Sequence, residues 1–421
     1  MYNLKNVYGV ISFNKSRIKV LVVERAESGK VNCLYNNCVS LNYLNANNQF
    51  INKEELSKTL LNMLTKADEF IGIVVKRYIV NISYMPVEIV KNISTDHEVK
   101  VNHELDLADY MSYTSKVNFL NGNNDKTIID LHPYLWTLDG MNHSEFPYGI
   151  TGKNINFEYY AYVANADFVK SFRDLVHECK VSIIGFINNQ LSFGGLLART
   201  NSGKKNVVID VKSDSSTINF YDTHNILIHS ESLNWGSNWM VDELKHKFNI
   251  PENVNLIPII DSLQTINLVD SSTSLINVHK PKFLNLMCAS AGELTKYVKI
   301  INQKFMNVVQ NKINDILCRK NQLSYDHIYI NANSMAYSFL DISTNINYEF
   351  FKTNIIGIDD NNIDVLVGSI EYTYNVQKSK KHIKYSIDPY VSQEYANRSV
   401  KRDVLLNIGL ITTKWSAKLG G

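Results

Sequence analysis

The sequence lacks the features that mark membrane-spanning, secreted and disulfide-bonded proteins. It has no run of about eighteen apolar residues, so we expect no membrane-spanning helix. Met1 to Lys5 shows no signal-peptide pattern, and we therefore expect a cytosolic chain. The cysteines are odd in number and contain no CxxC pair, which argues against a disulfide framework and a zinc site. We expect buried free thiols at Cys33, Cys38, Cys179, Cys288 and Cys318.

A large excess of either charge is also absent. The 43 basic and 41 acidic side chains leave a formal net charge of +2, which gives no signal for binding nucleic acid. The histidines His132, His143 and His177 have no partner at ligand spacing. We therefore predict no metal site and no catalytic residue, and we expect these histidines to be structural or exposed.

The chain is long enough for two lobes, and one pattern occurs in it twice. Its 421 residues, 45% of them hydrophobic, predict a bilobed protein or two to four subdomains. Tyr8 to Glu24 contains two β runs around a polar turn at Ser12 to Arg17. Val207 to Tyr221 (VVIDVKSDSSTINFY) repeats this arrangement. The repetition of a hairpin indicates two halves of similar architecture.

Two segments have the spacing of amphipathic helices. Lys53 to Phe70 carries leucines at helical spacing with charges on the other face, and an apolar run follows it. Ala291 to Cys318 carries a longer apolar stripe, which consists of Leu294, Val298, Ile301, Phe305, Val308, Ile313 and Ile316. Without a family in mind, both stripes predict helices that pack against a core.

Turn residues divide the stretch from Asp130 to Asn165. An Asp139-Gly140 turn is followed by a Pro147-Tyr148-Gly149 corner, a break at Gly152 and an alternating strand from Ile155. On the residues alone, this pattern predicts a module rich in β-hairpins.

The same stretch resembles a segment of the bacterial cell-division protein family FtsA, in which an aspartate-glycine turn precedes a proline-x-glycine corner. The resemblance implies an α/β, actin-like fold, in which a ribonuclease H-like half is duplicated into two lobes and an FtsA-type subdomain is inserted. The implied domains are residues 1–83 and 163–199 for the first-lobe core, 84–162 for the inserted subdomain, 200–236 and 320–375 for the second-lobe core, 237–319 for a fourth subdomain, 376–402 for a basic linker and 403–421 for an amphipathic membrane-targeting helix.

The resemblance also implies where a nucleotide would bind. The corresponding residues are Asn14, Lys15 and Ser16 in the first phosphate loop, Asp210, Lys212, Ser213 and Ser216 in the second, Gly236 in the turn that follows, Lys304 and Asn307 beside the nucleoside, and Asn333 under the adenosine. Asn189 takes the position that aligns the hydrolytic water in the family; a plain helix cap is the alternative.

Glycine is missing from nearly all of these loop positions. Phosphate loops use glycine because converging backbone N–H groups need unusual φ values and close approach. Only Gly236 remains. We therefore predict weak or absent ATP binding and no meaningful hydrolysis. Lys15, Lys212 and Asp210 support the alternative, which is weakened binding of ATP with Mg in a non-standard mode.

The C-terminal sequence predicts a linker followed by an amphipathic helix. Lysines cluster at residues 378–384, and Pro389 interrupts the segment. The apolar face and its flanking lysines are Val404, Ile408, Ile411, Lys414, Trp415, Lys418 and Leu419. This composition is typical of a helix at a membrane interface. A final helix that docks on the protein core is the alternative.

The resemblance to FtsA implies an adaptor for cell division. Its partners would be the C-terminal peptide of the tubulin-like protein FtsZ, further copies of the chain in dimers or filaments, and an anionic membrane surface, with no nucleic acid. Its location would be the cytoplasmic face of the cell membrane at the division site. An active actin-like ATPase and an MreB-like cytoskeletal filament protein are the alternatives.

Overall fold

The computed structural model describes residues 7–15, 17–26, 30–45, 49–75, 77–120, 125–200, 203–256, 260, 275–277, 288–321, 323–333, 336, 339–340, 349–350 and 363–379. These residues form two compact units. The first contains the described residues up to Thr200 and those from Val365 onward, and the second contains the others.

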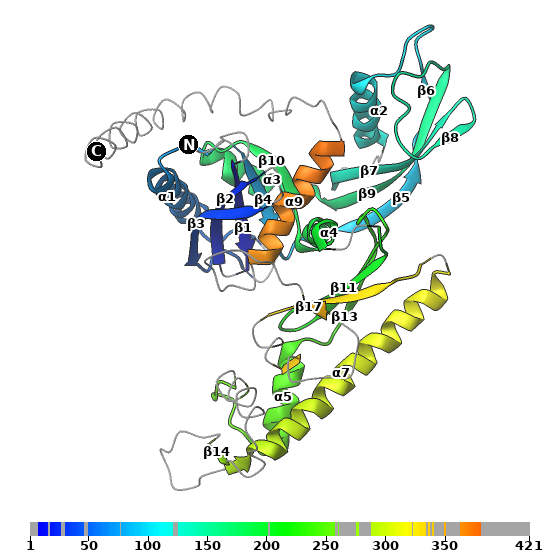
Figure 1. Cartoon of the computed structure of the whole chain (residues 1–421). Helices are drawn as coiled ribbons and strands as arrows, with labels where there is room; N and C mark the ends of the chain where they lie inside the picture. The colour runs from blue at the N-terminus through cyan, green and yellow to red at the C-terminus, as the bar shows by residue number, and fades with distance from the viewer. Residues whose placement is uncertain are drawn as a thin grey trace, which may run out of the picture. The chain divides into compact units, whose positions relative to one another are not determined.

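The first unit is built on a five-stranded sheet of order β3-β2-β1-β4-β10 (Figure 1). The strands β1, β2 and β3 form an antiparallel meander, whereas β4 and β10 run parallel to β1. The strands are β1 (Val7–Asn14), β2 (Arg17–Arg25), β3 (Val31–Ser40), β4 (Tyr78–Ile82) and β10 (Ile183–Ile187).

The second unit repeats this sheet, with order β13-β12-β11-β16-β17 and the same strand directions. Its strands are β11 (Asn206–Val211), β12 (Ser216–Tyr221), β13 (Leu227–Leu233), β16 (His327–Ala332) and β17 (Glu349–Phe350). A meander followed by two parallel strands, present twice, is the duplicated ribonuclease H-like arrangement. The predicted actin-like α/β fold is therefore confirmed.

Helices bury the apolar faces of both sheets. In the first unit, α1 (Lys53–Ile71) and α3 (Ala166–Glu178) share one core with the sheet, in which β1, β2 and β4 are almost wholly buried. Asn52 caps α1 by accepting a hydrogen bond from the Glu55 N–H, and Gly72 ends the helix with φ 75°. In the second unit, α5 (Ser237–Phe248) and α7 (Ala291–Arg319) share one core with the sheet. The short strands β14 (Leu275–Asn277) and β15 (Cys288–Ser290) pair with each other.

The stretch from Asp130 to Asn165 lies in a second sheet of the first unit, of order β5-β9-β7-β8 with β6 paired to β9. Its elements are β5 (Glu88–Ile93), β6 (His97–Glu98), α2 (Leu107–Leu120), β7 (Lys126–Leu138), β8 (Met141–His143) and β9 (Asn154–Asn165). Asp139 and Gly140 both have positive φ, at 47° and 83°, and turn β7 into β8. The predicted hairpin-rich module is therefore present.

Two element boundaries differ from those predicted. The first hairpin turn was predicted at Ser12 to Arg17, but Asn14 pairs directly with Arg17. Phe13 and Ile18 are fully buried and face each other across the hairpin, so both strands extend further into the predicted turn. Residues 376–379 were predicted to begin a linker, but they form the last turn of α9 (Ile363–Ser379).

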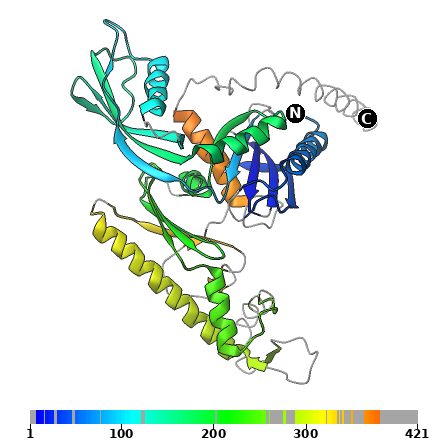
Figure 2. The same cartoon turned by 180° about the vertical axis from the view of Figure 1, so that it is seen from behind.

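The helix α9 also belongs to a different unit from the one predicted. The sequence placed it at the end of the second-lobe core, yet its residues from Val365 on group with the first unit. Gly368 lies so close to α4 (Asn189–Thr200) that an added Cβ would sit 2.3 Å from the Ser192 carbonyl oxygen. Figures 1 and 2 both show α9 beside α4. Two small residues, Gly195 and Gly368, make this close approach sterically feasible.

The side chains of four of the cysteines are described, and all four are free. The prediction of burial is confirmed for Cys179 but is wrong for Cys38 and Cys318, which are exposed, and Cys33 is half-buried. Cys38 lies on the edge strand β3 and Cys318 in the last turn of α7, where neither reaches a core.

Burial raises the pKa of the Cys179 thiol to about 11. We expect the native chain to react with a thiol reagent at Cys38 and Cys318 at about pH 8, and Cys179 to react only after denaturation. Because burial raises the pKa of Cys179 in the folded chain, the protonated thiol favours the folded state. This contribution to the free energy of unfolding is complete below the unfolded pKa of 9.0 and is lost as the pH rises toward about 11. Mass mapping of the labelled cysteines checks the first expectation, and labelling of native Cys179 at a rate equal to Cys38 would contradict it.

No helix in the described part of the chain is both long and apolar enough to cross a membrane. The predicted membrane-binding residues between Val404 and Leu419 lie outside the described residues.

Candidate functional site

The turn between β11 and β12 takes the position predicted for the second phosphate loop. The Lys212 N–H donates to the Ser215 carbonyl at 2.9 Å, which closes a tight turn. Ser216 begins β12, and its hydroxyl donates to the Trp235 carbonyl at 2.6 Å. The turn is thereby tied to the segment that leads into α5.

The same turn occupies the N-terminus of α5. The Ser237 N–H donates to the Lys212 carbonyl at 2.9 Å, and the Asn238 N–H donates to the Ser213 carbonyl at 2.8 Å. An added Cβ on Gly236 would sit 2.4 Å from the Ser213 carbonyl oxygen, so this approach requires glycine. Anions commonly bind at helix N-termini because free N–H groups point at them. Here two of these N–H groups already bind carbonyls of the turn.

The charges around the turn also differ from those of a phosphate cradle. Asp210 is buried, and its carboxylate accepts a hydrogen bond from Asn331 Nδ2 at 2.7 Å. Lys212 Nζ lies 3.6 Å from the other carboxylate oxygen of Asp210. Asp214 accepts a hydrogen bond from Asn238 Nδ2 at 2.8 Å. Two carboxylates against one ammonium make this turn unfavourable for a phosphate group.

Asn333 connects the turn region to the end of β16. Its Nδ2 donates to the Ser237 hydroxyl at 2.9 Å, and its backbone N–H donates to the Val211 carbonyl at 3.2 Å. The structure therefore brings together these predicted site residues: Asp210, Lys212, Ser213, Ser216, Gly236 and Asn333. Sequence reasoning missed Asn331, Ser237 and Asn238. Asn331 is directly opposite Asp210 in the β11–β16 ladder, a pairing that becomes visible only when the register is known.

The other residues that were predicted to bind the nucleotide do not contact the β11–β12 turn among the interactions of the described residues. Lys304 and Asn307 are exposed on α7, and Lys304 Nζ is 3.3 Å from Glu243 on α5. In the first unit, the Asn14 side chain accepts a hydrogen bond from the Lys15 N–H at 2.7 Å, and the Asn14 carbonyl accepts one from the Tyr43 hydroxyl. Ser16 lies outside the described residues.

Asn189, the predicted position for aligning water, is the first residue of α4. The cap is formed one residue earlier, because the Asn188 side chain accepts a hydrogen bond from the Leu191 N–H at 3.0 Å. The predicted alternative of a capped helix start is therefore right in kind, with Asn188 as the capping residue.

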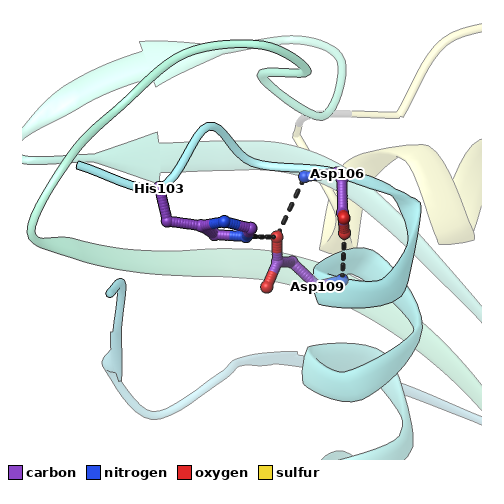
Figure 3. A group of neighbouring side chains, drawn as sticks. All are labelled: His103, Asp106 and Asp109. Atoms are coloured by element: carbon purple, nitrogen blue, oxygen red, sulfur yellow. Dashed lines mark hydrogen bonds and ion pairs between the residues drawn. The ribbon is translucent and has the colours of Figure 1, made fainter. Parts of the chain in front are cut away.

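A group of side chains that could hold a metal occurs at the start of α2 (Figure 3). Asp106 Oδ1 accepts from the Asp109 N–H at 3.0 Å, Asp109 Oδ2 accepts from the Asp106 N–H at 2.9 Å, and His103 Nε2 lies 2.6 Å from Asp109 Oδ2. The reciprocal bonds are a capping box. The backbone hydrogen bond from Asp109 is the main cause that lowers the pKa of Asp106. Helix capping accounts for this cluster.

No protein-family model matches the sequence, and no curated protein matches it. Among solved structures, the chain is similar to one described as the PilM-PilN type IV pilus biogenesis complex, with 10% identity, 89% of this chain and 98% of that chain covered, and a TM-score of 0.49. It is also similar to the ethanolamine utilization protein EutJ from Carboxydothermus hydrogenoformans, with 8% identity, coverage of 87% and 89%, and a TM-score of 0.42. A third is ParM of Bacillus thuringiensis with ATP, with 11% identity, coverage of 89% and 99%, and a TM-score of 0.37. The duplicated strand order described above establishes the fold.

Proposed function

We propose that this chain is an actin-like adaptor that works without hydrolysing a nucleotide. The observation that carries the proposal is the contact between the β11–β12 turn and α5, in which the Lys212 and Ser213 carbonyls bind the first N–H groups of the helix. A phosphate would have to displace these hydrogen bonds and approach the Asp214 carboxylate. The turn is a structural joint in this proposal, and ATP with Mg binds weakly or not at all.

The proposed adaptor links a protein partner to a membrane surface. Following the FtsA resemblance of residues 130–165, we propose the C-terminal peptide of FtsZ as the partner and the cytoplasmic face of the membrane at the division site as the location. Attachment would depend on avidity, because several weak membrane contacts on a self-associating scaffold add up to stable binding.

The C-terminal composition supports the membrane contact. Trp415 lies between Lys414 and Lys418, and apolar residues recur at helical spacing around it. Such a segment binds anionic lipid through both its apolar face and its lysines. The alternative, docking of the segment on the protein, would leave the chain unable to bind vesicles.

A reconstitution with FtsZ and anionic vesicles tests this function. We expect the full chain to pellet with the vesicles and to bring FtsZ with it, whereas a chain that ends at Asn397 should leave both proteins in solution. An FtsZ variant without its C-terminal peptide is the matched control for the protein contact. Equal pelleting of the full and shortened chains would contradict the membrane contact, and equal recruitment of the two FtsZ forms would contradict the partner.

A further inference from the structure

The inserted sheet and α9 meet at a partly buried polar contact in the first unit. The Tyr372 hydroxyl of α9 donates to Asp130 Oδ2 of β7 at 2.7 Å. His132 Nε2 lies 2.6 Å from the same hydroxyl oxygen and 3.2 Å from the same carboxylate oxygen. Tyr372 is only 7% exposed. The three side chains form a closed triangle that joins two elements about 240 positions apart in sequence.

The carboxylate of Asp130 can only accept, so the Tyr372 hydroxyl donates to it. His132 Nε2 lies within hydrogen-bond distance of both the hydroxyl oxygen and the carboxylate, and its tautomer decides whether it donates or accepts. Each member contacts the other two. A closed network of this kind is more specific than a single hydrogen bond, because losing one member removes contacts of both others in a partly buried place.

The register of β7 explains why these residues reach α9. Asp130 and His132 are two positions apart and therefore lie on the same face of the strand. The pairing of β7 with β9 shifts between Ile128 and Asp130. Ile129, at this bulge, packs against the core of the first-lobe sheet, whereas Ile128 and Leu131 pack against the core of the inserted sheet. At this bulge, next to the contact with Tyr372, the strand therefore packs against both cores.

The helix α9 is anchored on its other sides to the first lobe. Glu371 pairs with Arg25 of β2 at 3.1 Å and with Arg199 of α4 at 3.6 Å. Ser369 shares hydrogen bonds with Ser192 at 2.7 Å and Asn81 at 3.2 Å. Residues 365–373 are all buried. The helix therefore has fixed contacts to the lobe, and Tyr372 is the residue that adds the polar contact to β7.

We propose that the Asp130–His132–Tyr372 triangle is a latch that couples the inserted subdomain to α9, the last described element before the C-terminal residues. Binding of a partner to the inserted subdomain would alter the stability of α9 through this contact. By linkage, binding at α9 would alter the stability of the subdomain by the same free energy. The latch itself does not depend on the proposed adaptor function. Its role does rest on that function, because the latch would regulate the link between a bound partner and the C-terminal segment.

Hydrogen exchange of the full chain tests the latch without any partner or membrane. Tyr372→Phe removes the hydroxyl and keeps the ring. We expect exchange to become faster by about tenfold or more in peptides from both β7 and α9, with peptides from β11 and β12 unchanged. Tyr374→Phe is the matched control, because it removes the same hydroxyl group two residues further along the helix. The Tyr374 ring centroid lies 3.6 Å from Arg25 Cζ, and a phenylalanine ring can keep this contact.

The result separates a latch from a local packing role. Faster exchange in α9 alone, or an equal response of β7 to Tyr374→Phe, would overturn the proposal. A double-mutant comparison measures the coupling between the Asp130 and Tyr372 side chains directly. It uses Asp130→Asn alone and Asp130→Asn combined with Tyr372→Phe. We expect the double variant to exchange no faster than the more affected single variant, and fully additive effects would also overturn the latch. Because no partner is used, this outcome is independent of the reconstitution with FtsZ.

Discussion

Replacing Glu371 with alanine is expected to lower the opening free energy of α9 by about 3–5 kcal/mol. The Glu371 side chain is 2% exposed and pairs with Arg25, which is 11% exposed. Arg199 approaches the same carboxylate from α4. Removing the carboxylate would leave the Arg25 guanidinium in a poorly solvated place without its counter-charge, and this cost exceeds the loss of one hydrogen bond.

Native-state hydrogen exchange in increasing urea measures this effect in peptides from α9. Glu243→Ala is the matched control, because Glu243 is also on a helix but is paired with Lys304 at the surface. Such exposed pairs contribute about 0–1 kcal/mol. A loss below about 1 kcal/mol for Glu371→Ala would show that α9 does not depend on the buried pair.

The second large effect is expected for Gly236→Ala, with a destabilisation of about 1–3 kcal/mol in the second unit. The new methyl group would lie 2.4 Å from the Ser213 carbonyl and 2.5 Å from the Lys212 carbonyl, so the turn must move away from α5. This movement would break the hydrogen bonds from the Ser237 and Asn238 N–H groups. Helix α5 would then lose the partners of its first turn.

Two tryptophans report this change directly. The ring centroids of Trp235 and Trp239, which flank Gly236 in the sequence, lie 4.2 Å apart. We expect Gly236→Ala to weaken their near-ultraviolet circular dichroism and to lower the urea midpoint of the second unit. Gly185→Ala is the control, since nothing lies within 4 Å of its added Cβ. A wild-type spectrum and midpoint for Gly236→Ala would refute the close packing of the turn on α5.

The sequence predicted the parts of the fold that depend on local patterns. The repeated hairpin and the Asp139-Gly140 turn could be recognised because strand alternation and turn residues act over a few positions. The apolar stripe of α7 was nearly right, although Val309 is fully buried and Val308 is not. Helical spacing leaves this one-residue ambiguity wherever two apolar residues are adjacent.

The parts that sequence reasoning missed depend on long-range packing. Nothing local to Glu371 indicates that Arg25 and Arg199 lie beside it, because the Arg25 pair spans 346 positions. For the same reason α9 was assigned to the wrong lobe. At the candidate site, the loss of glycine was visible, but the occupation of the α5 N-terminus by the Lys212 and Ser213 carbonyls was not. That contact depends on the backbone path of two segments that are not adjacent in sequence.

Isothermal titration of the full chain with ATP and magnesium is the direct test of whether the β11–β12 turn has lost nucleotide binding. The Lys212 and Ser213 carbonyls of the β11–β12 turn bind the first N–H groups of α5, and the turn carries the Asp214 carboxylate. We therefore expect no saturable binding in the low-micromolar range. A low-micromolar dissociation constant that requires magnesium would contradict it.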